Sequence, residues 1–143
     1  MRFLLIDNSN TRTKFTIGNS DGLESWLARV PTKAISPTVL DKTLAGQSFD
    51  AVMLCSVVPE KAALMAEYFS SLPFHQLGYQ TNMGIHIDYP KPEQIGADRL
   101  ANAAGVHHLH GCPAIVIDFG TAVTFDAVGP NATYLGGVIA PGL

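Results

Sequence analysis

The sequence is poor in cysteine, in charged residues and in long apolar runs, and each shortage argues against a class of protein. Cys55 and Cys112 are the only two cysteines and form no Cys-x-x-Cys spacing, so we expect reduced, buried thiols. No apolar stretch approaches the roughly 18 residues that cross a membrane. The apolar start, Phe3 to Ile6, stops at Asp7 and is too short for a signal peptide. These shortages predict a cytoplasmic protein with no membrane partner.

Charged residues make up 15% of the chain, and the formal net charge is −3. There is no basic run and no alternation of basic and aromatic residues, so we expect no nucleic-acid partner. The hydrophobic content of 47% is ordinary for a globular core. A length of 143 residues allows one domain, or one domain and part of another.

The opening stretch combines a strand pattern with polar turn chemistry. The apolar run Phe3 to Ile6 enters Asp7, a polar turn from Asn8 to Thr11 follows, and residues 12 to 17 alternate as a second strand. Such a turn can offer backbone N–H groups, hydroxyls and amides to a phosphate, with Lys14 adding positive charge. The alternative is a β-hairpin whose aspartate only caps an Asx-turn.

The next segments predict strands alternating with helices. Ser36 and Pro37 form an N-cap and a first helical residue, so a helix is expected to about Ala45. A second helix is expected from Pro59 to about Ser70. The strands expected around them are residues 25–30, 51–56 and 75–77. A meander followed by such crossovers predicts a mixed α/β sheet flanked by helices.

The last third of the chain returns to a strand pattern. We expect a surface loop from Gly78 to Pro92 and a helix from Pro92 to about His110, with Gly96 in its first turn. His107 and His110 lie near its end and suit either the helix dipole or a metal. The strands expected after it are residues 114–118, 122–128 and 133–139.

Two strand-to-turn segments repeat the same pattern. Phe3 to Asp7 and Ile115 to Asp118 are apolar runs that end in aspartate, and Thr11 or Thr121 follows within a few residues. An internal duplication of a half-domain explains this pattern, with two acidic turns facing each other across a cleft. One turn would hold phosphates while the other aspartate holds a cation. The alternative is two unrelated hairpins with similar turns.

Five segments resemble, in the same order, motifs of the type III pantothenate kinase family. That family belongs to the acetate and sugar kinase, Hsp70 and actin superfamily. The segments are Asp7–Lys14, Cys55–Pro59, Tyr89-Pro90 with Gly96–Arg99, Asp118–Thr124, and Gly136–Gly142. The resemblance implies a ribonuclease-H-like (actin-like ATPase) fold of two halves, with residues 1–111 as the first domain and 112–143 as the start of the second.

The resemblance also implies a reaction and its residues. The reaction is ATP-dependent phosphorylation of pantothenate to 4'-phosphopantothenate, the first step toward coenzyme A, in a homodimer. The residues implied to bind ATP are Asp7, Asn8, Ser9, Asn10, Thr11, Arg12, Thr13, Lys14 and Thr121. Those implied to bind pantothenate are Tyr89, Gly96, Ala97, Asp98 and Arg99. Asp98 would be the catalytic base, Asp118 would bind a monovalent cation (K⁺ or NH₄⁺), and Asp7 would hold Mg²⁺ through ATP.

Physical arguments support these roles and leave alternatives open. A helix N-terminus favours a carboxylate such as Asp98, and Arg99 can bind a carboxylate in bidentate fashion. The alternatives are a first-turn aspartate with a solvated arginine, and a turn-capping role for Asp118.

Two departures from the family pattern matter. Ser9 stands where the family has glycine, and serine is costly there if the position needs positive φ. The chain also stops within the second half, so we expect a truncated chain whose strands from Ala114 on lack a covering layer. The other functions considered are a non-catalytic nucleotide-binding or regulatory relative, a different kinase of the superfamily, and an inactive fragment.

Overall fold

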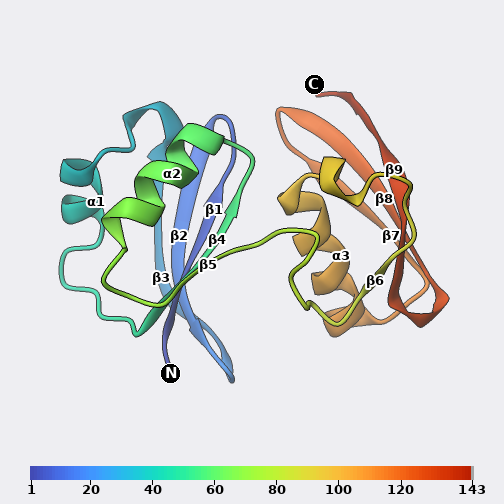
Figure 1. The fold of residues 1–143 in the computed structure, drawn as a ribbon, viewed down its shortest axis with the longest axis horizontal. Helices are drawn as coiled ribbons and strands as arrows, with labels where there is room; N and C mark the ends of the chain where they lie inside the picture. The colour runs from blue at the N-terminus through green and yellow to red at the C-terminus, as the bar shows by residue number, and fades with distance from the viewer. Residues whose placement is uncertain (143) are drawn as a thin grey trace. The chain divides into compact units, whose positions relative to one another are not determined.

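The computed structural model describes residues 1–142, which form two compact units (Figure 1). The first unit comprises residues 1–77 and the second begins at Gly78. Helix α3 (Ala97–His110) packs against strands of the second unit. The domain boundary expected between residues 111 and 112 stays a prediction. Among residues 1–142, no helix is long and apolar enough to cross a membrane.

The first unit is a mixed five-stranded sheet in the order β3-β2-β1-β4-β5. Strand β1 lies at its centre, antiparallel to β2 on one side and parallel to β4 on the other. The strands are β1 (Phe3–Asn8), β2 (Arg12–Asn19), β3 (Gly22–Pro31), β4 (Ala51–Ser56) and β5 (Phe74–Gln76). A meander followed by parallel crossovers is the topology that the sequence predicted.

Alternation along β1 and β2 determines which side chains form the core of this unit. Leu4 and Ile6 point to the same face as their cross-strand partners Ile17 and Phe15, and all four are buried. The buried residues packed with them include Leu40, Leu54 and Met65 from the helices and β4. Burying each such side chain contributes about 1.5–3 kcal/mol.

The two helices of the first unit begin where the sequence predicted. Ser36 is the N-cap of α1 (Pro37–Thr43), and its hydroxyl oxygen accepts a hydrogen bond from the Val39 N–H at 3.2 Å. Helix α2 (Pro59–Tyr68) begins with proline at its first position and packs against β4. Each helix ends about two residues before the predicted end. A short 3₁₀ turn, η1 (Thr32–Ala34), connects β3 to α1.

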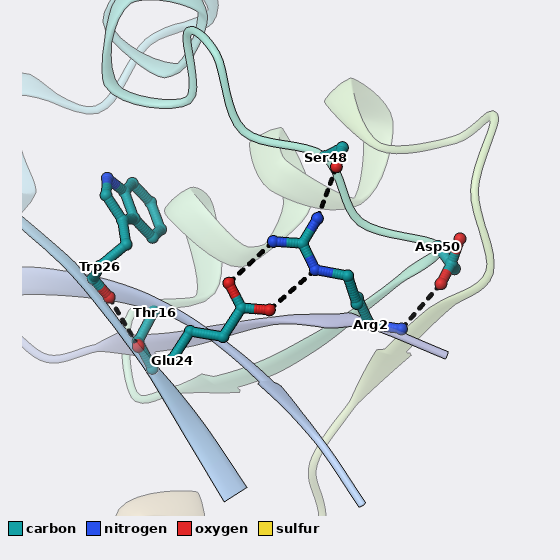
Figure 2. A network of polar contacts seen from close by, with 6 residues as sticks. All are labelled: Arg2, Thr16, Glu24, Trp26, Ser48 and Asp50. Atoms are coloured by element: carbon teal, nitrogen blue, oxygen red, sulfur yellow. Dashed lines mark hydrogen bonds and ion pairs between the residues drawn. The ribbon is translucent and has the colours of Figure 1, made fainter. Parts of the chain in front are cut away.

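A polar network surrounds Arg2 at the start of strand β1 (Figure 2). The Arg2 guanidinium donates to both carboxylate oxygens of Glu24 at 2.8 Å and to the Ser48 hydroxyl at 2.5 Å. The Arg2 backbone N–H donates to Asp50 at 2.7 Å. The hydrogen bond to Arg2 lowers the pKa of Glu24. The network therefore ties the start of β1 to β3 and to the segment before β4.

The second unit is a four-stranded sheet in the order β6-β9-β8-β7. Its strands are β6 (His86–Ile87), β7 (Ala114–Phe119), β8 (Ala122–Gly129) and β9 (Thr133–Pro141), with a 3₁₀ turn η3 (Pro130–Ala132) before β9. Helix α3 packs against β7 and β8. The hydrophobic core of the second unit is centred on the buried residues Ala103, Val128 and Tyr134.

Two predictions in this unit were wrong in detail. The helix expected from Pro92 begins at Ala97, because residues 92–94 form a separate 3₁₀ turn, η2 (Pro92–Gln94), and Gly96 is the N-cap. The expected loop from Gly78 to Pro92 contains the short strand β6, which pairs in parallel with β9. A two-residue strand has too little alternation to be recognised from the sequence.

The sheet face of the second unit opposite α3 carries exposed apolar side chains. They are Ile115, Ile117, Phe119, Phe125 and Val138. Cys55 and Cys112 are not joined in a disulfide, and both are half-buried rather than buried.

Candidate functional site

The turn between β1 and β2 places a carboxylate beside a cation. Asp7 and Lys14 are cross-strand partners, and Asp7 Oδ2 lies 3.6 Å from Lys14 Nζ. The Ser9 N–H donates to the Arg12 carbonyl at 3.1 Å, which closes the turn. The two charged side chains are 46% and 49% exposed, so both are accessible to a ligand. A carboxylate beside an ammonium can hold a metal–phosphate group.

Ser9 causes none of the strain expected from its replacement of glycine. The described residues other than glycine with positive φ are Asn131 and Ala132, and Ser9 is not among them. Its hydroxyl donates instead to Asp7 Oδ1 at 3.0 Å. Serine is therefore compatible with this backbone, and it adds a contact that holds the Asp7 carboxylate.

Two of the residues predicted to bind ATP are buried beneath the turn. Asn8 donates to the Thr13 hydroxyl at 2.8 Å and accepts from the Ser56 hydroxyl at 2.6 Å. The hydroxyls of Thr13 and Thr32 lie 2.9 Å apart, and Thr32 donates to the Ser9 carbonyl at 2.6 Å. Asn8 and Thr13 therefore brace the turn from inside, which leaves the ligand-facing surface to their neighbours. Sequence reasoning missed Thr32 and identified Ser56 only as part of a motif.

The exposed rim of the same turn consists of Asn10, Thr11 and Arg12. These residues offer an amide, a hydroxyl and a guanidinium at the surface, beside Lys14. Amides, hydroxyls and cationic side chains are the groups that bind phosphate oxygens. The exposed residues of this turn therefore have the chemistry that binding a phosphate requires.

The start of α3 carries the predicted Gly-Ala-Asp-Arg residues. Gly96 is the N-cap, and Ala97, Asp98 and Arg99 form the first turn. Asp98 Oδ1 accepts a hydrogen bond from the Arg99 N–H at 2.9 Å. A carboxylate in the first turn interacts favourably with the positive end of the helix dipole.

The Arg99 side chain is largely buried and forms an ion pair. Arg99 Nε donates to Asp126 Oδ1 at 2.7 Å, and Tyr134 donates to the same oxygen at 2.7 Å. The side chains of Arg99 and Asp126 are 14% and 0% exposed. Burial would lower the pKa of Arg99, but the hydrogen bond and charge of Asp126 outweigh it and raise this pKa. Burial and the bond to Asp126 also raise the pKa of Tyr134.

Two glycines of β9 permit this cluster to form. A Cβ on Gly137 would lie 1.9 Å from the Phe125 carbonyl oxygen and 2.5 Å from Arg99 Nη2. Gly136 has φ +121°, and a Cβ there would lie 3.3 Å from the Tyr89 ring. The Tyr89 ring packs edge-on against Tyr134 with 6.4 Å between centroids. The structure thus brings Tyr89 and Arg99, both predicted to bind pantothenate, to one cluster.

Sequence reasoning missed Asp126 and Tyr134 as members of this cluster. Asp126 lies two residues beyond the segment that carried the resemblance, and no spacing rule connects it to Arg99. The signal available was the Gly136-Gly137 pair, because adjacent glycines inside a strand often mark a close approach of other groups.

Asp118 lies at the end of β7 on the face that α3 covers. Its Oδ2 accepts a hydrogen bond from Asn102 of α3 at 2.9 Å, and the carboxylate is exposed. Thr121 lies exposed in the turn that follows. An exposed carboxylate oriented by an amide can bind a cation.

The histidines near the end of α3 were considered as a metal site from the sequence. Among residues 1–142 no group of three or more His, Cys, Asp or Glu side chains is placed to hold a metal. His107 Nδ1 instead lies 3.7 Å from the Cys112 sulfur.

The fold is that of an actin-like ATPase-fold protein. The chain is similar to the ethanolamine utilization protein EutJ from Carboxydothermus hydrogenoformans (TM-score 0.53, 10% identity, 99% of this chain and 52% of that one). It is also similar to a putative sugar kinase from Cytophaga hutchinsonii (TM-score 0.50, 16% identity, 100% and 52%). At these identities the likeness shows the fold alone, and it confirms the predicted fold class.

A family model described as type III pantothenate kinase matches residues 3–143, and the chain belongs to this family. It is 52% identical over 143 residues to a type III pantothenate kinase from Akkermansia muciniphila. It is 41% identical over 140 residues to one from Methylacidiphilum infernorum. The chain spans 59% and 51% of the lengths of these two relatives, while they cover 100% and 98% of it.

Proposed function

We propose that the protein containing this chain transfers the γ-phosphoryl group of ATP to the hydroxyl of pantothenate. The observation that carries the proposal is the first turn of α3. There Asp98 and Arg99 place a proton acceptor directly beside a group that binds carboxylates. The names of the relatives support the same reaction.

The proposed roles follow from what each side chain can do. Asp98 takes the proton of the pantothenate hydroxyl, whose oxygen then bonds to the γ-phosphorus as the bond to ADP breaks. Arg99 and Tyr89 hold the substrate, with Gly96 and Ala97 allowing its close approach. Ser9, the rim residues Asn10 to Arg12, and Lys14 hold the ATP phosphates, and Thr121 is proposed separately to contact ATP.

The two exposed aspartates suit cations, because hard cations prefer carboxylate oxygens. We propose that Asp7 holds Mg²⁺ through ATP and that Asp118 holds K⁺ or NH₄⁺. A bound cation offsets negative charge on the phosphates during transfer. The homodimer and the cytoplasmic location also remain proposals.

The decisive experiment replaces Asp98 in the protein as its natural gene encodes it. Asp98→Asn should lower ATP-dependent phosphorylation of pantothenate by about 100-fold or more, because it removes the proton acceptor while keeping the shape. Formation of the phosphate ester can be followed by ³¹P NMR or mass spectrometry.

The matched control is Glu93→Gln, which neutralises an exposed acid on the 3₁₀ turn before α3 and should change turnover less than twofold. Retained activity of Asp98→Asn would contradict the role of Asp98. ATP binding without any phosphorylation of pantothenate by the unchanged protein would instead select a non-catalytic relative.

A further inference from the structure

The guanidinium of Arg99 is held from one side by a carboxylate that is itself fully buried. Arg99 Nε and Nη2 both lie 2.7 Å from Asp126 Oδ1. Tyr134 donates to that oxygen from the other strand, so three groups converge on one atom. Such convergence restricts the rotation of both the arginine and the aspartate.

The cluster leaves buried hydrogen-bonding capacity unused. Arg99 Nη2 is within ion-pair distance of Asp126 but makes no hydrogen bond, and Asp126 Oδ2 has none either. A guanidinium carries five N–H donors, and Asp126 faces only the edge formed by Nε and Nη2. Buried donors without partners are rare in native proteins and often indicate a ligand or a water. The unused donors suit a second carboxylate, because a guanidinium binds carboxylates in bidentate fashion.

The surroundings hold this arrangement rigidly. Asp126 and Gly137 are cross-strand partners, and a side chain on Gly137 would overlap both Asp126 Oδ1 and Arg99 Nη2. Tyr134 is buried in the core of the unit and packs against the Tyr89 ring. The guanidinium therefore has a defined position before any substrate arrives, and a preformed position lowers the entropy cost of binding.

We propose that Asp126, supported by Tyr134, is a positioning residue that orients Arg99 toward the carboxylate of the substrate. It thereby sets the preference for an acidic substrate over an uncharged analogue. This inference rests on the proposed phosphorylation of pantothenate. Asp126 touches neither substrate nor ATP in this scheme and acts only through Arg99. An ion pair that served stability alone would set no such preference.

The test compares two substrates in the protein as its natural gene encodes it. One is pantothenate, and the other is its alcohol analogue, in which CH₂OH replaces the carboxylate. Asp126→Asn keeps the shape but removes the charge that holds Arg99. We expect the ratio of kcat/KM for the acid over the alcohol to fall about tenfold or more.

KM for pantothenate should rise with little change in kcat, because Asp126 acts on the binding of the carboxylate and not on the proton acceptor. KM for ATP should change less than twofold. Arg99→Gln should lower the same ratio. Added to Asp126→Asn, the Arg99→Gln change should lower the ratio by less than a further twofold, because both residues act through the same contact. Glu93→Gln is again the matched control.

The ratio of kcat/KM for the two substrates separates a positioning role of Asp126 from a purely structural one. A parallel loss for the acid and the alcohol, or an unchanged ratio, overturns the positioning role and leaves a purely structural ion pair. If Asp126→Asn does not fold, Tyr134→Phe decides, because it removes one donor to Asp126 and should lower the same ratio by about threefold. An unchanged ratio in that variant also overturns the role. Absence of pantothenate phosphorylation in the unchanged protein would instead contradict the proposed function itself.

Discussion

The two units contain the same three-stranded meander in different surroundings. Strand β1 ends in Asp7 and β7 reaches Asp118, and each turns into an antiparallel partner. Strand β1 pairs on both edges, whereas β7 pairs on one edge within residues 1–142. Leu4 is 0% exposed and its counterpart Ile115 is 64% exposed. The apolar residues of such a strand become core only where a helix covers their face.

The helices account for this difference. In the first unit Leu40 of α1 and Met65 of α2 pack onto the face that carries Leu4 and Ile6. In the second unit α3 lies on the opposite face, where Asn102 contacts Asp118. The polar cluster around Arg99 could form on that face because α3 brings charged side chains to the sheet.

The largest expected effect tests this comparison directly. Leu4→Ala should lower the free energy of unfolding of the first unit by about 2–5 kcal/mol, because it removes a buried side chain and leaves a cavity. Ile115→Ala, its counterpart, should change stability by only about 0.5 kcal/mol. Urea unfolding monitored by hydrogen exchange separates the two units. Equal losses would mean that the face of Ile115 is covered in the protein.

A smaller effect is expected from the glycine beside the Arg99 cluster. Gly137→Ala should destabilise the second unit by about 1–3 kcal/mol, because its Cβ would overlap the Phe125 carbonyl oxygen. Leu27 of β3 occupies the corresponding position beside Thr16 in the first unit, where a large side chain is tolerated. Leu27→Ala is therefore the control, with a change of about 0.5 kcal/mol. Normal hydrogen-exchange protection of β8 and β9 in Gly137→Ala would contradict the close packing.

The smallest effect concerns a tyrosine–aspartate pair in each unit. Tyr68 donates to Asp41 and Tyr134 donates to Asp126, both at 2.7 Å. Burial and the bond to Asp41 raise the pKa of Tyr68 from 10.0 to about 12. The folded chain then keeps a proton that the unfolded chain loses, so this stability is complete below pH 10 and lost as the pH rises toward 12.

Absorbance titration of the tyrosines checks this prediction. The phenols of Tyr68 and Tyr134 should ionise later than a free tyrosine, because both pKa values are raised, and Tyr68→Phe should remove the contribution of Tyr68 from this late phase. Phenylalanine at 68 should also reduce the loss of stability between pH 10 and 12. A titration curve that is unchanged by Tyr68→Phe above pH 10 would contradict the Tyr68–Asp41 pair.

Local sequence patterns were sufficient to predict most of the helices and strands and some of the residues of each candidate site. The Ser36 cap, the proline at the start of α2 and the two apolar strands ending in aspartate each depend on residues adjacent in the chain. Such features are readable because the physical cause lies within a few residues. The order of the motifs was also sufficient to identify the family.

The tertiary structure alone decided how those residues are used. Asp7 and Lys14 were expected to meet, because a tight turn joins their strands, whereas the pairing of Arg99 with Asp126 spans 27 residues. Asn8 and Thr13 look like ligand-binding residues in the sequence but point inward, toward Thr32 and Ser56. Burial and pairing depend on which distant element packs against a face, and a local pattern contains no information on that element.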